Sequence, residues 1–218
     1  MRHHFLAATA LGALFFTGCK SGPDPQVSNP WFAATYAFND AGFASAASSG
    51  ADINQPNRDK NTPLHEAVLL DNVKAVQYFI SRGANVEAVD EDLQTPLYFA
   101  ADKGKTASAK ALIAGGANVN ARDEDGHTPL MAAVEDGYSE LVKELIAAKA
   151  DLNVKDKEGS TALHYAADEG QVEVIRMLLD AKADPSIRDK KGRTALTIAM
   201  EQKQVGCVQA LQAQGGKL

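Results

Sequence analysis

The stretch Thr62-Pro63-Leu64-His65 opens a pattern that returns every 33 residues and decides the fold. A threonine oxygen caps a helix start, and proline at the first helical position has no amide hydrogen to leave unpaired. Each copy therefore predicts the first turn of a helix. The later copies keep the same spacing and are Thr95-Pro96-Leu97-Tyr98, Thr128-Pro129-Leu130-Met131, Thr161-Ala162-Leu163-His164 and Thr194-Ala195-Leu196-Thr197.

A second pattern begins 21 residues after the start of each repeat and is expected to end a second helix. Glycine suits this end because it adopts the left-handed backbone conformation without a steric penalty. Lys149 and Lys182 stand where the other copies have glycine, and each is expected to cost about 1 kcal/mol. The copies are Gly50-Ala51-Asp52-Ile53-Asn54, Gly83-Ala84-Asn85-Val86, Gly116-Ala117-Asn118-Val119-Asn120, Lys149-Ala150-Asp151-Leu152-Asn153 and Lys182-Ala183-Asp184-Pro185.

Apolar residues recur at helical spacing in both helices and predict one buried face for each repeat. A single repeat cannot bury this face alone, so stability must come from stacked neighbours, and the terminal repeats should be atypical caps. Trp31 and Phe32 stand in the first repeat where Leu and His would be expected. In the second repeat the apolar face is formed by Leu64, Ala67, Val68, Val73, Val76, Phe79 and Ile80.

The 33-residue period and the Thr-Pro-Leu-His box together resemble the ankyrin repeat, whose signature they match. The resemblance covers residues 29–218 and implies an all-α repeat solenoid of helix–turn–helix units joined by β-turn or hairpin loops. We expect six repeats, with divergent first and last copies, at 29–61, 62–94, 95–127, 128–160, 161–193 and 194–218.

The composition is that of a folded globular chain, with 45% hydrophobic and 23% charged residues. The formal net charge of -6 and the absence of any basic run longer than Lys190-Lys191 argue against a nucleic-acid partner. Two cysteines cannot build a disulfide framework. We expect the free chain to be a monomer.

The beginning of the sequence has the layout of a secretory signal peptide. Arg2 precedes the apolar stretch 5–16, which rises only about 18 Å as a helix and is too short for a hydrocarbon core of about 30 Å. Phe16-Thr17-Gly18-Cys19 resembles a bacterial lipobox, which implies lipid chains on Cys19, and Lys20 resembles the outer-membrane default. The alternative is an ordinary signal peptide cut near Gly18.

These features predict a signal peptide at 1–18 and a lipidated Cys19 with a tether at 19–28. The resemblance to lipoproteins then implies a protein anchored to the outer membrane on its periplasmic side. Such an anchor binds a protein to the bilayer without spanning it.

No residue pattern predicts catalysis, a cofactor or a metal site. His65 and His164 occupy the box position at which ankyrin repeats use histidine to hydrogen-bond neighbouring loops, and no metal or triad partner accompanies them. Cys207 falls at a helix position filled elsewhere by small or apolar residues, so we expect it in the core. The stretch Asp123-Glu124-Asp125-Gly126 lacks the spacing of a calcium loop and is expected to be a β-turn. We therefore expect a protein that is not an enzyme.

The resemblance implies that a protein partner binds in the concave groove of the solenoid. Six of the last eight positions that end the first helices are acidic, although carboxylates there oppose the helix dipole. Apolar residues beside them are of the type that anchors an interface. The predicted protein-binding residues are Leu69, Leu70, Phe99, Asp102, Glu135, Asp136, Tyr165, Asp168 and Glu169.

An acidic groove predicts a basic protein partner, and Lys190, Lys191 and Arg193 form a smaller basic cluster on one turn that could contact lipid head groups or an acidic edge of the partner. An acidic surface that serves only solubility is the simpler reading. The leading hypothesis is a lipid-anchored binding protein, in its sharper form an immunity protein that neutralises a secreted toxin. The alternative is an envelope or oxidative-stress accessory that supports a periplasmic enzyme.

Overall fold

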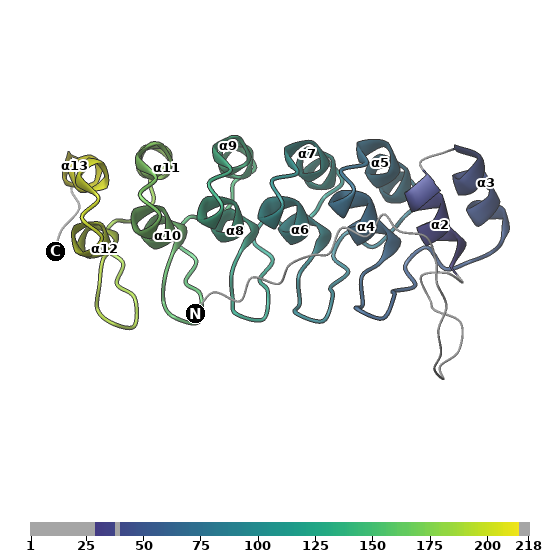
Figure 1. Cartoon of the computed structure of the whole chain (residues 1–218), viewed down its shortest axis with the longest axis horizontal. Coiled ribbons are helices and arrows are strands. Elements are labelled where there is room, and N and C mark those ends of the chain that lie inside the picture. Colours follow the sequence, from purple (N-terminus) through teal and green to yellow (C-terminus); the bar gives the residue numbers. More distant parts are fainter. Residues whose placement is uncertain (1–28, 38–39, 214–218) are drawn as a thin grey trace, which may run out of the picture.

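The computed structural model describes residues 29–37 and 40–213, and within these ranges the chain forms helices and turns without a strand. Two parallel rows of helices build an elongated stack (Figure 1). We call the row that lies next to the long connecting loops the inner row. It consists of α2 (Pro30–Ala37), α4 (Pro63–Leu69), α6 (Pro96–Asp102), α8 (Pro129–Glu135), α10 (Ala162–Asp168) and α12 (Ala195–Glu201). The outer row consists of α3 (Asp40–Ser48), α5 (Val73–Ser81), α7 (Thr106–Ala114), α9 (Ser139–Ala147), α11 (Val172–Asp180) and α13 (Val205–Ala213).

The predicted all-α repeat solenoid is confirmed, with turns in place of regular hairpins between the described helix pairs. None of the described helices is both long and apolar enough to cross a membrane. The expected signal peptide at 1–18 and the expected lipidated Cys19 with its tether at 19–28 lie outside the described residues.

The threonine of each box caps an inner helix, as the sequence predicts. Thr95 accepts a hydrogen bond from the Tyr98 amide at 3.2 Å, so one unpaired amide of the first turn is satisfied. In α4 the cap is reciprocal, because the Thr62 amide in turn donates to Nδ1 of His65 at 3.1 Å. The predicted helix starts are therefore built from side-chain caps together with proline at the start of α4, α6 and α8.

Both box histidines connect one repeat to the next, which confirms the expected structural role. Nε2 of His65 donates to the carbonyl oxygen of Gln94 at 3.2 Å, and Nε2 of His164 donates to that of Arg193 at 3.1 Å. Burial lowers the pKa of His65 to about 4, so this ring is neutral at pH 7, with one nitrogen accepting and the other donating. These histidines hold the following turn against the start of the inner helix.

Alanine at one position of every inner helix lets the helices approach closely. Each inner helix packs on the next inner helix and each outer helix on the next outer one. Large aliphatic residues such as Leu97 and Leu112 are fully buried around these contacts. The fully buried alanines at equivalent positions are Ala67, Ala100, Ala133, Ala166 and Ala199.

An aromatic cluster closes the N-terminal end of the described stack. The Trp31 and Phe43 rings lie 5.7 and 5.6 Å from the Phe79 ring, both in edge-to-face geometry. The Trp31 indole also donates to the carbonyl oxygen of Ala51 at 3.0 Å. The first helix pair is therefore an atypical cap, as expected: it keeps a buried alanine, Ala34, and adds large aromatic rings to the contact with α5.

Hydrogen bonds between neighbouring turns fix the repeats in register. The amides of Glu124, Lys157 and Lys190 donate to the carbonyl oxygens of Asp92, Asp125 and Glu158, at 2.8, 2.9 and 2.8 Å. The predicted β-turn at 123–126 is confirmed, with the Gly126 amide donating to the Asp123 carbonyl at 3.0 Å. Equivalent positions of successive repeats therefore lie next to one another along the stack.

Lys149 and Lys182 adopt the left-handed conformation predicted for them, with φ of 67° and 74°. Gly50, Gly83 and Gly116 hold the same position with φ of 71°, 78° and 88°. The two lysines therefore carry the backbone strain that glycine avoids.

We predict that Lys149→Gly raises the free energy of unfolding by about 1 kcal/mol, because glycine relieves the left-handed strain. Lys143→Gly is the matched control: Lys143 is exposed inside α9, so glycine there should cost about 1 kcal/mol. Urea unfolding followed by circular dichroism measures both changes. Equal losses in the two variants would contradict the strain at Lys149.

Candidate functional site

Six acidic residues line the C-terminal ends of four neighbouring inner helices. We call this surface the acidic stripe; it consists of Asp102, Glu135, Asp136, Asp168, Glu169 and Glu201. The helices that carry it, α6, α8, α10 and α12, pack against one another in sequence and lie side by side in the inner row of Figure 1. The structure therefore brings together all five acidic residues predicted for the binding surface and adds Glu201.

Three members of the acidic stripe have partners within the chain. The Asp102 carboxylate lies 2.6 Å from the ammonium of its neighbour Lys103. The Asp168 carboxylate accepts a hydrogen bond from the side-chain amide of Gln202 at 2.6 Å. Glu201 pairs with the Arg193 guanidinium at 3.2 Å. The middle of the stripe has weaker compensation: His127 and Lys103 lower the pKa values of Glu135 and Asp136, but less than burial raises them.

Glu135, Asp136 and Glu169 are exposed and have no ion pair among the described residues. Partial burial of its carboxylate raises the pKa of Glu135, and the charges of Asp136 and Glu169 raise it further. Partial burial and the charge of Asp102 likewise raise the pKa of Asp136. The ionised stripe is thus self-repelling, and each carboxylate also opposes the dipole of its helix.

Tyrosine hydroxyls beneath the stripe are bound to buried turn aspartates. The Tyr165 hydroxyl donates to Oδ2 of Asp156 at 2.6 Å and lies 2.9 Å from Nε2 of His127. Burial raises the pKa of Tyr165, and its bond to the Asp156 carboxylate raises it further, so the hydroxyl remains protonated. This part of the surface is rigid and already hydrogen-bonded.

The turn aspartates are structural residues that the sequence analysis missed. Oδ1 of Asp156 accepts from the amides of Glu158 and Ser160, at 2.7 and 2.8 Å, and so closes the turn. The sequence does contain a signal for this role, because an Asp or Asn recurs at the same position of each 33-residue repeat. The column consists of Asn57, Asp90, Asp123, Asp156 and Asp189.

The apolar residues predicted as exposed anchors are mostly not exposed, which corrects that expectation. Only Leu70 is exposed, at 37%, whereas Leu69, Phe99 and Tyr165 are half-buried. The Phe99 ring packs edge-on against His65 at 5.0 Å between centroids. The Tyr165 ring likewise packs edge-on against His127, at 5.4 Å between centroids, so both rings are covered by a histidine from earlier in the chain.

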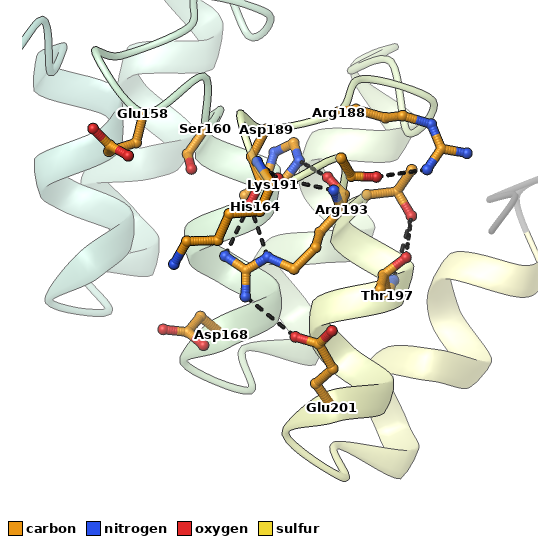
Figure 2. A network of polar contacts seen from close by, with 12 residues as sticks. Glu158, Ser160, His164, Asp168, Arg188, Asp189, Lys191, Arg193, Thr197 and Glu201 are labelled. Carbon is orange, nitrogen blue, oxygen red and sulfur yellow. Dashed lines mark hydrogen bonds and ion pairs between the residues drawn. The ribbon is translucent and has the colours of Figure 1, made fainter.

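The basic cluster expected at Lys190, Lys191 and Arg193 is also corrected. Arg193 is half-buried and bound within the chain, because its Nε and second terminal nitrogen lie 2.9 and 2.8 Å from Oδ2 of Asp189. Figure 2 shows this guanidinium between Asp189 and Glu201. Arg193 is thus an internal partner of the last turn, and its direction could not be inferred from its place beside the lysines.

The described residues offer no group of histidine, cysteine and carboxylate side chains that could hold a metal ion. Cys207 is 1% exposed, as expected for a core residue, and burial raises the pKa of its thiol. A buried, protonated thiol is a poor nucleophile.

Three copies of an ankyrin-repeat family model match the chain at residues 31–123, 105–189 and 130–217. The chain therefore belongs to the ankyrin-repeat family. Proteins of this family are in general non-catalytic modules for protein–protein interaction. A search of curated proteins gives no match.

We predict that Glu135→Gln combined with Asp136→Asn raises the free energy of unfolding at pH 7 by about 0.5 kcal/mol, the scale of exposed charge interactions. The pKa values of both carboxyls are raised in the folded chain. Their contribution to stability is therefore present below the ordinary carboxyl pKa and lost as the pH rises through the raised one. The gain should vanish in acid, where the native carboxyls are protonated.

Asp184→Asn provides a control of opposite sign. Hydrogen bonds from the Ser186 hydroxyl and amide lower the pKa of Asp184, so its contribution is present at neutral pH and lost as the pH falls. This variant should be less stable than the native chain at pH 7. Urea unfolding at neutral and acidic pH compares the two variants, and a loss of stability from both amide changes would refute a self-repelling stripe.

Proposed function

We propose that this protein binds a basic segment of another protein on the acidic stripe. One observation carries the proposal: Glu135, Asp136 and Glu169 lie together on the surface, and none of them has an ion pair among the described residues. Helix stability does not favour carboxylates at these helix ends. A lysine or arginine from a partner would relieve their repulsion and form charge-assisted hydrogen bonds.

The partner surface we propose carries cations in a row and one apolar side chain. Leu70 offers an exposed apolar contact on the N-terminal side of the stripe. Neighbouring packed helices lie about 8–10 Å apart, so successive acidic positions repeat at that distance. A helix covers this distance in about six residues and an extended chain in about three. The partner should therefore present its cations at one of these spacings.

We also propose that the binding surface is held at the outer membrane, on the periplasmic side, by lipid chains on Cys19. The support is the layout of residues 1–19 as a signal peptide and lipobox. In the sharpest form of the proposal the chain is an immunity protein, because a fixed acidic surface at the envelope suits capture of a basic secreted toxin. This form depends on the identity of the captured protein.

We predict that Asp136→Lys combined with Glu169→Lys abolishes partner binding and leaves the thermal melt nearly unchanged. Both residues are exposed and without an ion pair among the described contacts, so their reversal removes no stabilising bond. The measurement is a pull-down from solubilised membranes with the mature chain as bait. A stable variant that still captures the same partner would contradict the proposal, and so would a large loss of stability.

Glu140→Lys combined with Glu173→Lys is the matched control for charge. Both residues are exposed on the outer helices α9 and α11, and their reversal changes the net charge by the same amount. This variant should capture the partner as the native chain does. A basic toxin among the captured proteins would support the immunity role, whereas a periplasmic enzyme would favour the accessory role.

For the anchor, we predict that Cys19→Ser moves the mature protein from the membrane fraction to the soluble fraction. Without the thiol no lipid chain can be attached, and the apolar contact with the bilayer is lost. Cell fractionation with labelled fatty acid measures both effects. Cys207→Ser is the control, since Cys207 lies in the core. Unchanged membrane binding and labelling of the Cys19 variant would refute the anchor.

A further inference from the structure

The residue directly before the threonine of each box differs from repeat to repeat. In every one of these repeats its backbone amide donates to a side-chain oxygen of the turn residue four positions earlier. The backbone of the turn is thus fixed without help from the side chain at this position. The position is filled by Asn61, Gln94, His127, Ser160 and Arg193.

Arg193 shows what a cation does at this position. Its guanidinium lies 2.8 Å from Oδ2 of Asp189 and 3.2 Å from the Glu201 carboxylate. Figure 2 shows it between these two side chains. An arginine is not deprotonated in proteins. Arg193 therefore joins the last turn to the acidic stripe and offsets the charge of Glu201 at every pH.

His127 holds the same position two repeats earlier, and its ring lies against a hydroxyl group and a carboxylate. Nε2 lies 2.9 Å from the Tyr165 hydroxyl oxygen and 3.5 Å from Oδ2 of Asp156. Because the Tyr165 hydroxyl donates its hydrogen to Asp156, Nε2 of the neutral ring carries a hydrogen and donates to the Tyr165 oxygen. A proton gained in acid therefore goes to Nδ1.

Carboxylates surround His127 on several elements. Asp123 of its own turn accepts its backbone amide at 2.8 Å, and the Asp156 carboxylate of the next turn is 1% exposed. On α8, burial raises the pKa of Glu135, and the nearby charge of His127 lowers it. On α10, the Tyr165 hydroxyl stays protonated. A positive charge on the ring is thus felt by the acidic stripe as well as by the turn.

The helix on the N-terminal side, α6, adds groups that are neutral or already paired. Burial and the charge of Asp123 raise the pKa of Tyr98, so its hydroxyl is neutral. Asp102 at the end of α6 is paired with Lys103. The remaining charge near Glu135 comes from Asp136 and Glu169 of the stripe itself. Protonation of His127 is therefore the change that brings a cation to this group of carboxylates.

The other histidines of the described repeats are unsuited to this role. Burial lowers the pKa of His65 to about 4 and also lowers that of His164, and both rings are bonded to the following repeat. The His127 side chain is 22% exposed, so water reaches it. Histidine is the side chain whose ordinary charge change falls between about pH 5 and 8.

We propose that protonation of His127 weakens the binding of a basic partner to the acidic stripe. This inference rests on the proposed partner binding and adds its regulation. The cationic ring offsets Glu135 from the position at which Arg193 offsets Glu201. A cation of the partner then gains less from Glu135 and is repelled by the ring. The stripe therefore captures its partner near neutral pH and releases it in mild acid.

The experiment measures how the mature chain binds a fluorescent oligolysine peptide, by anisotropy at low ionic strength, where exposed charges are least screened. Lysine, with an ordinary pKa of about 10.4, stays charged between about pH 7.5 and about pH 6, so a change over this range comes from the protein. The affinity of the native chain should fall about threefold to fivefold on acidification, the scale of exposed charge interactions.

His127→Gln should bind the peptide equally at both pH values, because glutamine gains no proton. His127→Arg should bind it weakly at both, as the native chain does in acid. Both side chains suit this position of the fold, since Gln94 and Arg193 occupy it in other repeats. His127→Asn, which copies Asn61, is a second neutral variant. Thermal melts check that all three variants fold.

A second measurement does not depend on the peptide. Carboxyl titration by nuclear magnetic resonance should give a higher pKa for Glu135 in His127→Gln than in the native chain, because the His127 charge offsets part of the rise that burial causes. His127→Arg should not show this increase. Asp184, whose pKa is lowered by hydrogen bonds from Ser186, should titrate alike in every chain.

A native chain that binds the peptide equally at both pH values would overturn the inference and leave the proposed partner binding intact. A His127→Gln variant that keeps the native fall, or that leaves the pKa of Glu135 unchanged, would do the same. A native chain that binds no peptide at either pH would contradict both proposals. The combined Asp136→Lys and Glu169→Lys variant should bind no peptide at either pH, whereas native affinity in this variant would contradict the proposed function alone.

Discussion

Each helix pair leaves one apolar face uncovered, and only the next pair can close it. This constraint sets the rest of the structure, because the fully buried alanines of the inner helices tolerate no change of spacing between neighbours. The capped helix starts, the histidine bonds to the following turn and the bonds between turns all repeat with the period that the packing demands. The aromatic rings of Trp31 and Phe43 pack the first helix pair against Phe79 of the second.

A fixed period also aligns the residues that face outward. Small differences between repeats therefore add up to continuous surfaces, of which the acidic stripe is one. The turn residues Asn57, Asp90, Asp156 and Asp189 repeat with the same period, are buried and serve the fold. Charge that would be scattered in an irregular protein is concentrated here on defined faces. The proposed partner binding depends on this concentration of charge, which costs some stability where carboxylates repel each other.

The sequence was sufficient for the fold because the deciding contacts are local or periodic. Thr62 and His65 bond to each other, and His65 also bonds to a residue one repeat later. Lys149 adopts a backbone conformation that glycine holds at the same position of other repeats. The 33-residue period makes contacts of both kinds predictable. The acidic stripe could be placed for the same reason, since the register identifies the last residue of each inner helix.

The directions and partners of side chains were not accessible from the sequence. Tyr165 contacts His127, 38 residues earlier in the chain, and no pattern in the sequence links these two positions. Arg193 belongs by sequence to a basic cluster, but it turns to Asp189 and Glu201. Phe99 is half-buried because His65 of the preceding repeat packs against it. Such contacts depend on how neighbouring repeats are oriented, which the packing of whole helices decides.

The central claim is that the carboxylates in the middle of the acidic stripe repel one another in the free chain and have no ion pair among the described residues to offset that repulsion. Site-resolved carboxyl titration by nuclear magnetic resonance tests it most directly, with Asp184 as the internal reference. We expect the pKa values of Glu135 and Asp136 to lie above the ordinary carboxyl range, and that of Asp184 to lie below it. Glu135 and Asp136 titrating at or below ordinary values would contradict it, because the stripe would then already be neutralised within the chain.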